Sequence, residues 1–177
     1  MKTKITLIAT IALLIATRLF AQEASQTFPS AGFKVKCGCN LYVNTTFIQA
    51  AKQQGANNII AAYICAENQE SSENGAIYNI NVYDESAGYQ KIKPEHHAFF
   101  EKKCLESYAR NLSNAGYSYN YITYQGASAL EYSFDQMGLP TKAIVFYKNK
   151  KSYLIQVATR NSLATKYNAL KSSFALI

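Results

Sequence analysis

Four consecutive segments of alternating apolar and polar residues, separated by short connections, dominate the second half of the chain. They span residues 117–124, 128–135, 142–148 and 152–159. Alternation with a period of two is typical of a β-strand that buries one face. Because parallel strands need a long crossover, connections this short predict an antiparallel meander.

The first half of the chain continues the strand pattern. Residues 59–65 and 77–83 flank the polar segment Asn68–Gly75 and are predicted to form a hairpin. Residues 33–43 are predicted to form one long strand with alternate side chains on a common face. These side chains are Phe33, Val35, Cys37, Cys39, Leu41 and Val43.

Helical spacing appears where the strand pattern is interrupted. A helix is predicted from Pro94 to about Asn114, because apolar residues recur every four positions and Gly116 suits the position after its last turn. A second helix is predicted from about Ser162 to Phe174, and a shorter one over 45–54. Strands in runs with helices at the breaks indicate an α+β fold, an antiparallel β-sheet covered by helices.

The first 21 residues have the organisation of a cleavable signal peptide. Lys2 and Lys4 precede the apolar run Ile5–Ala16, and Ala21 is a small residue at the expected cleavage position. The alternative is an uncleaved membrane anchor, but the run is about a dozen residues where a membrane span needs about 20. We therefore expect an exported protein, periplasmic or secreted, with no transmembrane segment after cleavage. Residues 22–30 are expected to be a flexible tail, and residues 31–177 a single domain.

The charge distribution bears on the class of partner. The chain has a formal net charge of +7, and the expected signal peptide carries three of its cations. The remaining lysines are scattered, and the mature chain keeps only Arg110 and Arg160 as arginines. Nucleic-acid-binding proteins concentrate Lys and Arg on one face, so we expect no nucleic-acid partner.

Several short motifs together resemble the PsbP-like fold, which is shared by the extrinsic photosystem protein, the Ran-binding Mog-type protein and small exported bacterial relatives. The motifs are residues 28–35, Tyr124-Gln125-Gly126, residues 129–132 and the strand–turn–strand–helix unit 145–177. The resemblance implies an α/β/α sandwich that serves as a binding module. It carries over no catalytic residue, because the matching positions are turns and core residues.

The four cysteines are Cys37, Cys39, Cys65 and Cys104. An even number in an exported chain predicts two disulfides. We expect one bond from Cys37 or Cys39 to Cys65, and another from the remaining member of that pair to Cys104. A redox-active pair in Cys37-Gly38-Cys39, or thiolate ligands for a metal, are the alternatives.

Other polar residues give weaker indications. His96 and His97 are adjacent, so on a helix they point in directions about 100° apart, which suits one metal ion poorly. Glu131 and Asp135 recur four residues apart on a predicted strand, and are expected to be solvent-facing charges rather than a catalytic carboxylate pair. No nucleophile motif is present, and we expect no catalytic residue, metal or cofactor.

Tyrosines are the remaining candidates for a binding surface. Tyr117, Tyr119, Tyr121 and Tyr124 lie on one predicted strand, and Tyr132 on its neighbour. Tyrosine is common in half-buried sheet faces and in binding faces alike, so both interpretations stay open. The leading hypothesis is an exported, non-enzymatic binding module that contacts a protein or an envelope component. The alternatives are a thiol–disulfide redox protein that uses Cys37 and Cys39, and an immunity or inhibitor protein.

Overall fold

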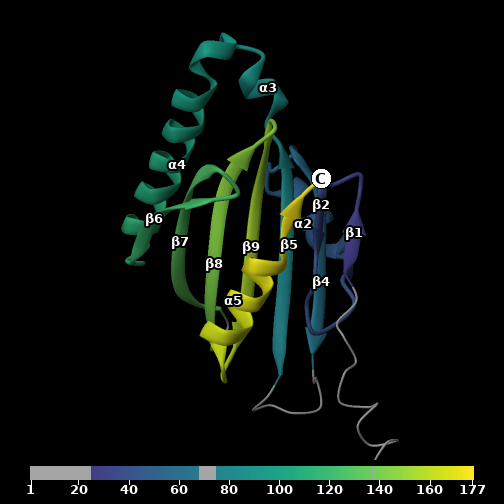
Figure 1. Ribbon diagram of the computed structural model, residues 1–177. Coiled ribbons are helices and arrows are strands. Elements are labelled where there is room, and N and C mark those ends of the chain that lie inside the picture. The colour runs from purple at the N-terminus through teal and green to yellow at the C-terminus, as the bar shows by residue number, and fades with distance from the viewer. Residues whose placement is uncertain (1–24, 68–74, 137) are drawn as a thin grey trace, which may run out of the picture.

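A strongly twisted antiparallel sheet forms the centre of the molecule (Figure 1). The computed structural model describes residues 25–67, 75–136 and 138–177, so the expected signal peptide lies outside the described residues. The strand order in the main sheet is β3-β4-β5-β9-β8-β7-β6. Its strands are β3 (Tyr42–Val43), β4 (Ile59–Glu67), β5 (Ala76–Asp84), β6 (Tyr119–Tyr124), β7 (Ala127–Gln136), β8 (Leu139–Lys148) and β9 (Lys151–Thr159).

The predicted meander is confirmed. Strands β6, β7, β8 and β9 pair antiparallel in succession, and β5 then pairs with β9. Asn149 and Lys150, which connect β8 to β9, both have positive φ angles (54° and 59°). A two-residue hairpin turn with positive φ at both positions matches the right-handed twist of the strands that it joins.

A second, smaller sheet contains both ends of the described chain. Strand β2 (Phe33–Val35) lies between β1 (Gln26–Phe28) and β10 (Ala175–Leu176), antiparallel to both. Residues 26–28 fall in the segment expected to be a flexible tail. They form a strand instead, because the Phe28 ring packs against Tyr63 with ring centroids 4.3 Å apart.

The prediction of one strand over 33–43 is wrong. Strand β2 ends at Val35, and the chain pairs again only at β3, on the edge of the main sheet. The intervening loop crosses from the small sheet to the main sheet and carries Cys37 and Cys39. The alternating residues Phe33, Val35, Cys37 and Leu41 nevertheless share one core between the small sheet and the main sheet. Val43 at the end of the segment is 52% exposed.

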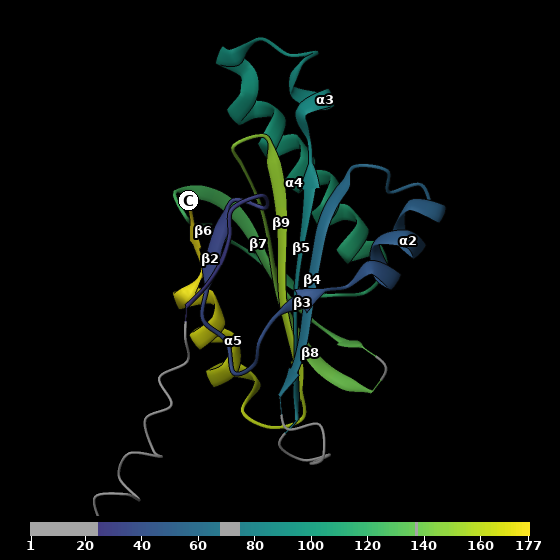
Figure 2. The same ribbon diagram turned by 90° about the vertical axis from the view of Figure 1, so that its right-hand side faces the viewer.

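Helices cover both faces of the main sheet, as expected for the α+β fold (Figure 2). Helix α5 (Leu163–Ser173) and the small sheet cover one face, where Tyr167 and Leu170 join a core with residues of β4, β5, β8 and β9. Helix α4 (His97–Asn114) covers the other face over β7 and β8, through Leu105, Ala109 and Leu112. The short helices α3 (Ser86–Tyr89) and η1 (Pro94–His96) lead into α4.

Helix α2 (Thr45–Gln53) lies beside β4 on the same side of the main sheet as α4 (Figure 2). Its N-cap Asn44 accepts a hydrogen bond from the Phe47 backbone N–H at 3.0 Å, which satisfies one donor of the first turn. No residue of α2 is buried. Among the described residues, no helix is long and apolar enough to cross a membrane.

Candidate functional site

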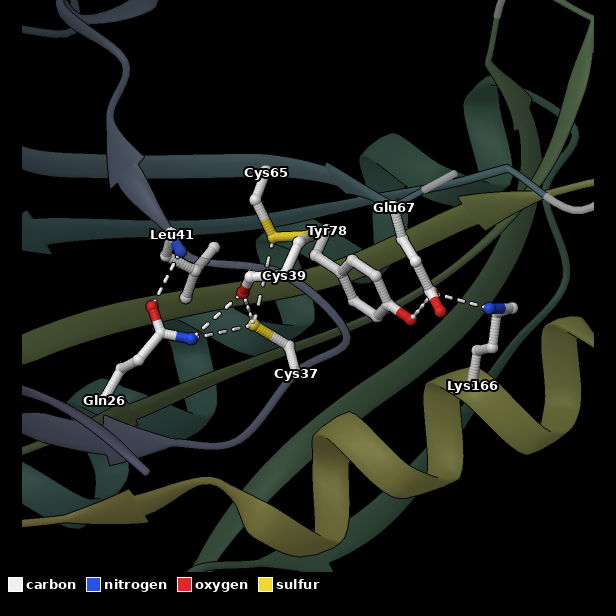
Figure 3. Close-up of a disulfide and its surroundings, with 8 residues drawn as sticks. All are labelled: Gln26, Cys37, Cys39, Leu41, Cys65, Glu67, Tyr78 and Lys166. Atoms are coloured by element: carbon white, nitrogen blue, oxygen red, sulfur yellow. Dashed lines mark hydrogen bonds and ion pairs between the residues drawn. A yellow bond between two sulfur atoms is a disulfide. The ribbon is translucent and has the colours of Figure 1, made fainter. Parts of the chain in front are cut away.

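Three sulfur atoms come together where the loop after β2 meets strand β4 (Figure 3). Cys39 and Cys65 form a disulfide with a Cα–Cα distance of 5.9 Å. The Cys37 thiol donates a hydrogen bond to Cys39 O at 3.0 Å, and its sulfur lies 3.9 Å from Cys65 Sγ. We call Cys37, Cys39 and Cys65 the sulfur cluster.

One of the two predicted disulfides is confirmed, as Cys39–Cys65, and the bond to Cys104 is wrong. Cys104 remains a thiol on α4, which covers the opposite face of the main sheet from the small sheet and its loop. Burial, followed by the negative charges of Glu85 and Glu101, raises the pKa of the Cys104 thiol. A thiol in that setting is a poor nucleophile.

Gln26 of β1 fixes the loop that carries the sulfur cluster (Figure 3). Its side-chain amide donates to Cys39 O at 3.0 Å and accepts from the Leu41 backbone N–H at 2.7 Å. The same amide nitrogen lies 3.5 Å from Cys37 Sγ. Gln26 could not be recognised from the sequence, because the strand that positions it is only three residues long.

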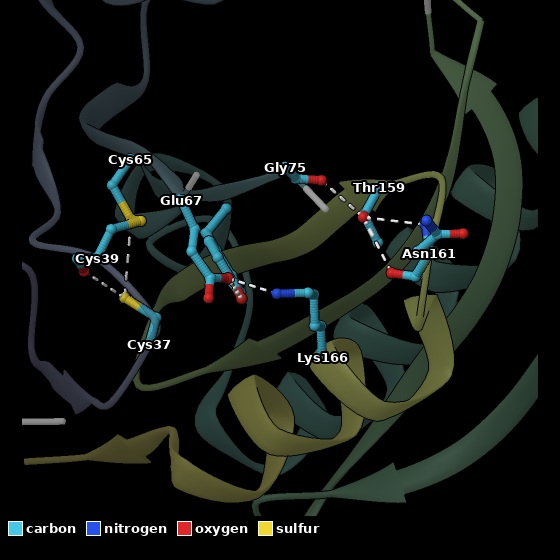
Figure 4. Close-up of polar contacts among 9 residues, drawn as sticks. Cys37, Cys39, Cys65, Glu67, Gly75, Thr159, Asn161 and Lys166 are labelled. Carbon is cyan, nitrogen blue, oxygen red and sulfur yellow. Dashed lines mark hydrogen bonds and ion pairs between the residues drawn. A yellow bond between two sulfur atoms is a disulfide. The ribbon is translucent and has the colours of Figure 1, made fainter. Parts of the chain in front are cut away.

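Charged groups lie next to the cluster (Figure 4). Lys166 of α5 and the Tyr78 hydroxyl donate to the Glu67 carboxylate, at 2.6 and 2.8 Å. Burial alone would raise the pKa of Glu67, but these hydrogen bonds outweigh it and the pKa is lowered. Beside them is a cavity of about 120 Å³, which is also lined by Lys36, Cys37 and Gly38.

The connection from β9 to α5 is held in place beyond Lys166 (Figure 4). The Thr159 hydroxyl donates to Gly75 O at 2.7 Å and accepts from the Asn161 backbone N–H at 3.3 Å. Thr159 is fully buried. These contacts tie the connection before α5 to the residue before β5.

The other face of the main sheet contains a larger hollow, with a volume of about 570 Å³. It lies between α2 and the part of the sheet covered by α4, and we call it the amide groove. Its lining residues are Asn44, Phe47, Ile64, Ile77, Asn79, Asn81, Tyr83, Tyr132, Phe134, Gln136, Leu154 and Gln156. Ligand sites for small molecules occupy a similar range of volumes, roughly 300–1,000 Å³.

Strand register brings the amides together in the floor of the groove. Asn79 of β5 lies directly opposite Gln156 of β9. Gln156 Nε2 donates to Gln136 Oε1 at 3.2 Å, and Asn81 and Gln156 are nearly buried. None of the described residues that line the groove is charged, so it offers neutral donors and acceptors next to aromatic rings.

The predicted tyrosine face is divided between the two sides of the sheet. Tyr132 lines the amide groove, and its hydroxyl lies 2.7 Å from the Tyr108 hydroxyl of α4. The Tyr117 ring contacts Phe134 of the groove, with ring centroids 5.8 Å apart. Alternation along β6 sends Tyr124 to the opposite face, where it is buried and donates to Lys171 O.

Tyr119 and Tyr121 pack against each other at a centroid distance of 5.9 Å, and Tyr121 is 54% exposed. Together with Tyr117 and Tyr132 they are on the α4 side of the sheet, because Tyr119 pairs with Tyr132 and Tyr121 with Leu130. Burial raises the pKa of Tyr132 well above its usual range, and the neighbouring Tyr108 hydroxyl raises it further. The Tyr132 hydroxyl therefore stays protonated and available as a donor.

Glu131 is not a solvent-facing charge. It points toward α5 and has a side chain that is 15% exposed, with Lys171 at 2.7 Å, Lys142 at 3.0 Å and the Tyr167 hydroxyl at 2.9 Å. Asp135 is exposed and accepts from the Gly138 backbone N–H. The spacing in the sequence predicts that both carboxylates face solvent. Helix α5 packs over Glu131, however, and only Asp135 is exposed.

The histidines occupy ordinary structural positions. His96 is exposed at the end of η1, and the His97 ring packs edge-on against Tyr89 at a centroid distance of 4.9 Å. Within the described ranges, no three His, Cys, Asp or Glu side chains are placed to hold a metal ion.

The amides of the groove, like Gln26, were not expected from the sequence to form a site. Strand β5 alternates buried Tyr78, Ile80 and Val82 with Asn79 and Asn81. Such alternation normally indicates that one face meets solvent, but here the second face is the floor of the amide groove, and Asn81 is buried there. The signal in the sequence for this groove was the pair of amides, Asn79 and Asn81, on the second face of β5.

No protein-family model matches this chain, and no curated protein matches it. Among solved structures, the chain is similar to the crystal structure of a protein of unknown function from Pseudomonas aeruginosa. The two share 16% sequence identity with a TM-score of 0.39, over 60% of this chain and 74% of the other.

Proposed function

We propose that this protein is an exported binding module that holds a neutral oligosaccharide of the cell envelope in the amide groove. The observation that carries the proposal is the composition of the groove, which joins side-chain amides to aromatic rings without a charged residue among those that line it. We infer the class of ligand from the chemical groups that would complement these amides and rings.

Side-chain amides both donate and accept hydrogen bonds, as sugar hydroxyls do. Five of the twelve lining residues are Asn or Gln. The rings of Tyr83, Phe134 and Phe47 offer apolar surface to the C–H faces of a sugar, and Phe47 is 39% exposed. A charged ligand would lose hydration there without gaining an opposite charge, so a neutral ligand is favoured.

Export is the second part of the proposal. The Cys39–Cys65 disulfide is compatible with an oxidising compartment, and the N-terminal sequence has the features of a signal peptide. We also propose that the chain is a relative of the PsbP-like proteins, which supports a binding role by analogy.

The test is a binding measurement with defined neutral sugars. Purified protein is titrated calorimetrically with maltohexaose, cellohexaose and the fully N-acetylated chitohexaose, and binding to at least one of them is expected. Asn79→Leu and Gln156→Leu keep the approximate side-chain volume but remove the amide that would hydrogen-bond to the sugar. Each is expected to weaken binding about tenfold, which is the equivalent of one buried hydrogen bond.

Asn120→Leu is the matched control, because Asn120 is an exposed amide on β6 and pairs with Glu131 on the α5 side of the sheet. It is expected to leave the affinity unchanged. The proposal is overturned if none of the three sugars binds, or if the groove variants bind as well as the control. If the protein binds an unstructured peptide and none of the three sugars, the groove is assigned to a protein partner instead.

A further inference from the structure

We propose that the sulfur cluster is an internal thiol–disulfide exchange centre, in which Cys37 can displace Cys39 from its bond to Cys65. This goes beyond the proposed binding function and uses the opposite face of the main sheet. Either proposal can therefore fail without the other.

The geometry places an attacking thiol beside the bond. Cys37 Sγ lies 3.9 Å from Cys65 Sγ, which is close to contact for two sulfur atoms. Cys37 and Cys39 are separated by Gly38 alone, so exchange needs a rearrangement of only one short loop. The loop runs from Val35, the last residue of β2, to Tyr42, the first residue of β3, and forms no strand between them.

The reaction consumes no oxidant. The Cys37 thiol loses its proton to solvent, and the thiolate sulfur forms a bond to Cys65 Sγ. The Cys39–Cys65 bond breaks, its electron pair stays on Cys39 Sγ, and that sulfur takes up a proton. The products are a Cys37–Cys65 disulfide and a Cys39 thiol, with the same number of disulfides and thiols as before.

Exchange moves the thiol toward the surface. Cys37 is only 6% exposed, whereas Cys39 is partly exposed. The cavity of about 120 Å³ reaches Cys37 and is also lined by Lys36 and Lys166. Positive charge near a thiol favours the thiolate, although the Glu67 carboxylate offsets Lys166 here. In the exchanged form the Cys39 thiol is accessible to an external disulfide or to a thiol-reactive molecule.

The test maps the disulfide directly. A Cys104→Ser protein, which removes the thiol on the other face, is incubated at about pH 8, near the ordinary pKa of a thiol, and then quenched in acid. Peptic peptides are analysed by tandem mass spectrometry, in which fragment ions assign the bond to Cys37 or to Cys39, because a peptide that contains both has the same mass in either form. Both Cys39–Cys65 and Cys37–Cys65 peptides are expected. The proposal is overturned if Cys39–Cys65 is the only disulfide found at every time point.

Two further variants in the same background check that Cys37 can take over the bond. Cys39→Ser is expected to form Cys37–Cys65 under air, and to keep a melting temperature within a few degrees of the parent because a cross-link of similar span remains. Cys65→Ser removes the shared partner and is expected to lose most of the stability that the disulfide provides. If the Cys39→Ser protein instead keeps both Cys37 and Cys65 as thiols, the exchange is excluded.

Discussion

The ring of Phe33 in β2 stacks on the ring of Phe174 at the end of α5, with centroids 5.0 Å apart and planes 20° apart. Both side chains are almost fully buried. Strand β10 follows Phe174 directly and pairs with β2, so elements near the two ends of the described range 25–177 close the same core. Aromatic packing therefore holds the small sheet in place together with its backbone pairing.

Phe174→Ala should be among the most destabilising single substitutions in this chain. Removing a fully buried Phe typically costs about 3–5 kcal/mol. Here the ring also contacts Tyr153 and Phe146, so little collapse of the cavity is expected. Urea denaturation measures the change, with Ile177→Ala as control, because Ile177 is 57% exposed. A loss below about 1 kcal/mol, within the range of surface substitutions, would contradict the packing described here.

Glu131→Gln should make stability depend less on pH. Burial alone would raise the pKa of Glu131, but hydrogen bonds from Lys171, Lys142 and Tyr167 outweigh it and lower the pKa from its ordinary value. Its stabilising effect is present above the pKa of the unfolded chain and is lost as the pH falls through the lower, folded pKa. The variant should lose about 1–3 kcal/mol at neutral pH, as for charge-assisted hydrogen bonds.

The difference in unfolding free energy between wild type and Glu131→Gln should shrink toward zero in acid. Measuring urea denaturation from neutral to strongly acidic pH shows whether it does. Glu95→Gln is the control, since Glu95 is exposed at the start of η1 and should change little at any pH. A constant difference across the whole range would mean that the ionised carboxylate is not what stabilises the fold.

The main sheet and its helices could be predicted from the sequence because their patterns are long and local. The segments 117–159 alternate over many residues, and the helical spacing before Gly116 covers several turns. The segment 33–43 also alternates, but only residues 33–35 and 42–43 are strands, and the loop between them is buried in the same core as β2. Periodicity records that residues are buried, and it does not record which element buries them.

The candidate sites depend on contacts between distant parts of the chain, which no local pattern contains. The sequence limited the partners of Cys65 to Cys37 or Cys39, but the choice of Cys39 depends on the loop that Gln26 holds. The amide groove requires β5 and β9 to be neighbours, although they are far apart in the sequence. That adjacency follows from how the first hairpin joins the meander.

Gly38→Ala should destabilise the loop through Glu67. A Cβ atom at position 38 would lie 2.7 Å from the Glu67 carboxyl carbon, so the carboxylate would have to move away from Lys166 and Tyr78. The expected loss is about 1 kcal/mol, the net value of a typical hydrogen bond. In a Glu67→Ala background the added methyl group has room, so the effect of Gly38→Ala should disappear. An equal loss in both backgrounds would show that the loop backbone is strained for another reason.

Tyr108 and Tyr132 should be coupled, because their hydroxyls lie 2.7 Å apart and join α4 to the sheet. Tyr132→Phe and Tyr108→Phe each leave the other hydroxyl without this contact, and each should lose about 1 kcal/mol. The double variant should lose less than the sum of the two, because no half-satisfied hydroxyl remains. Thermal denaturation of the four proteins gives the coupling energy, and additive losses would contradict a direct hydrogen bond. Since Tyr132 also lines the amide groove, Tyr108→Phe tests whether α4 holds that side chain in position: sugar affinity should fall in this variant although Tyr108 is not one of the residues that line the groove.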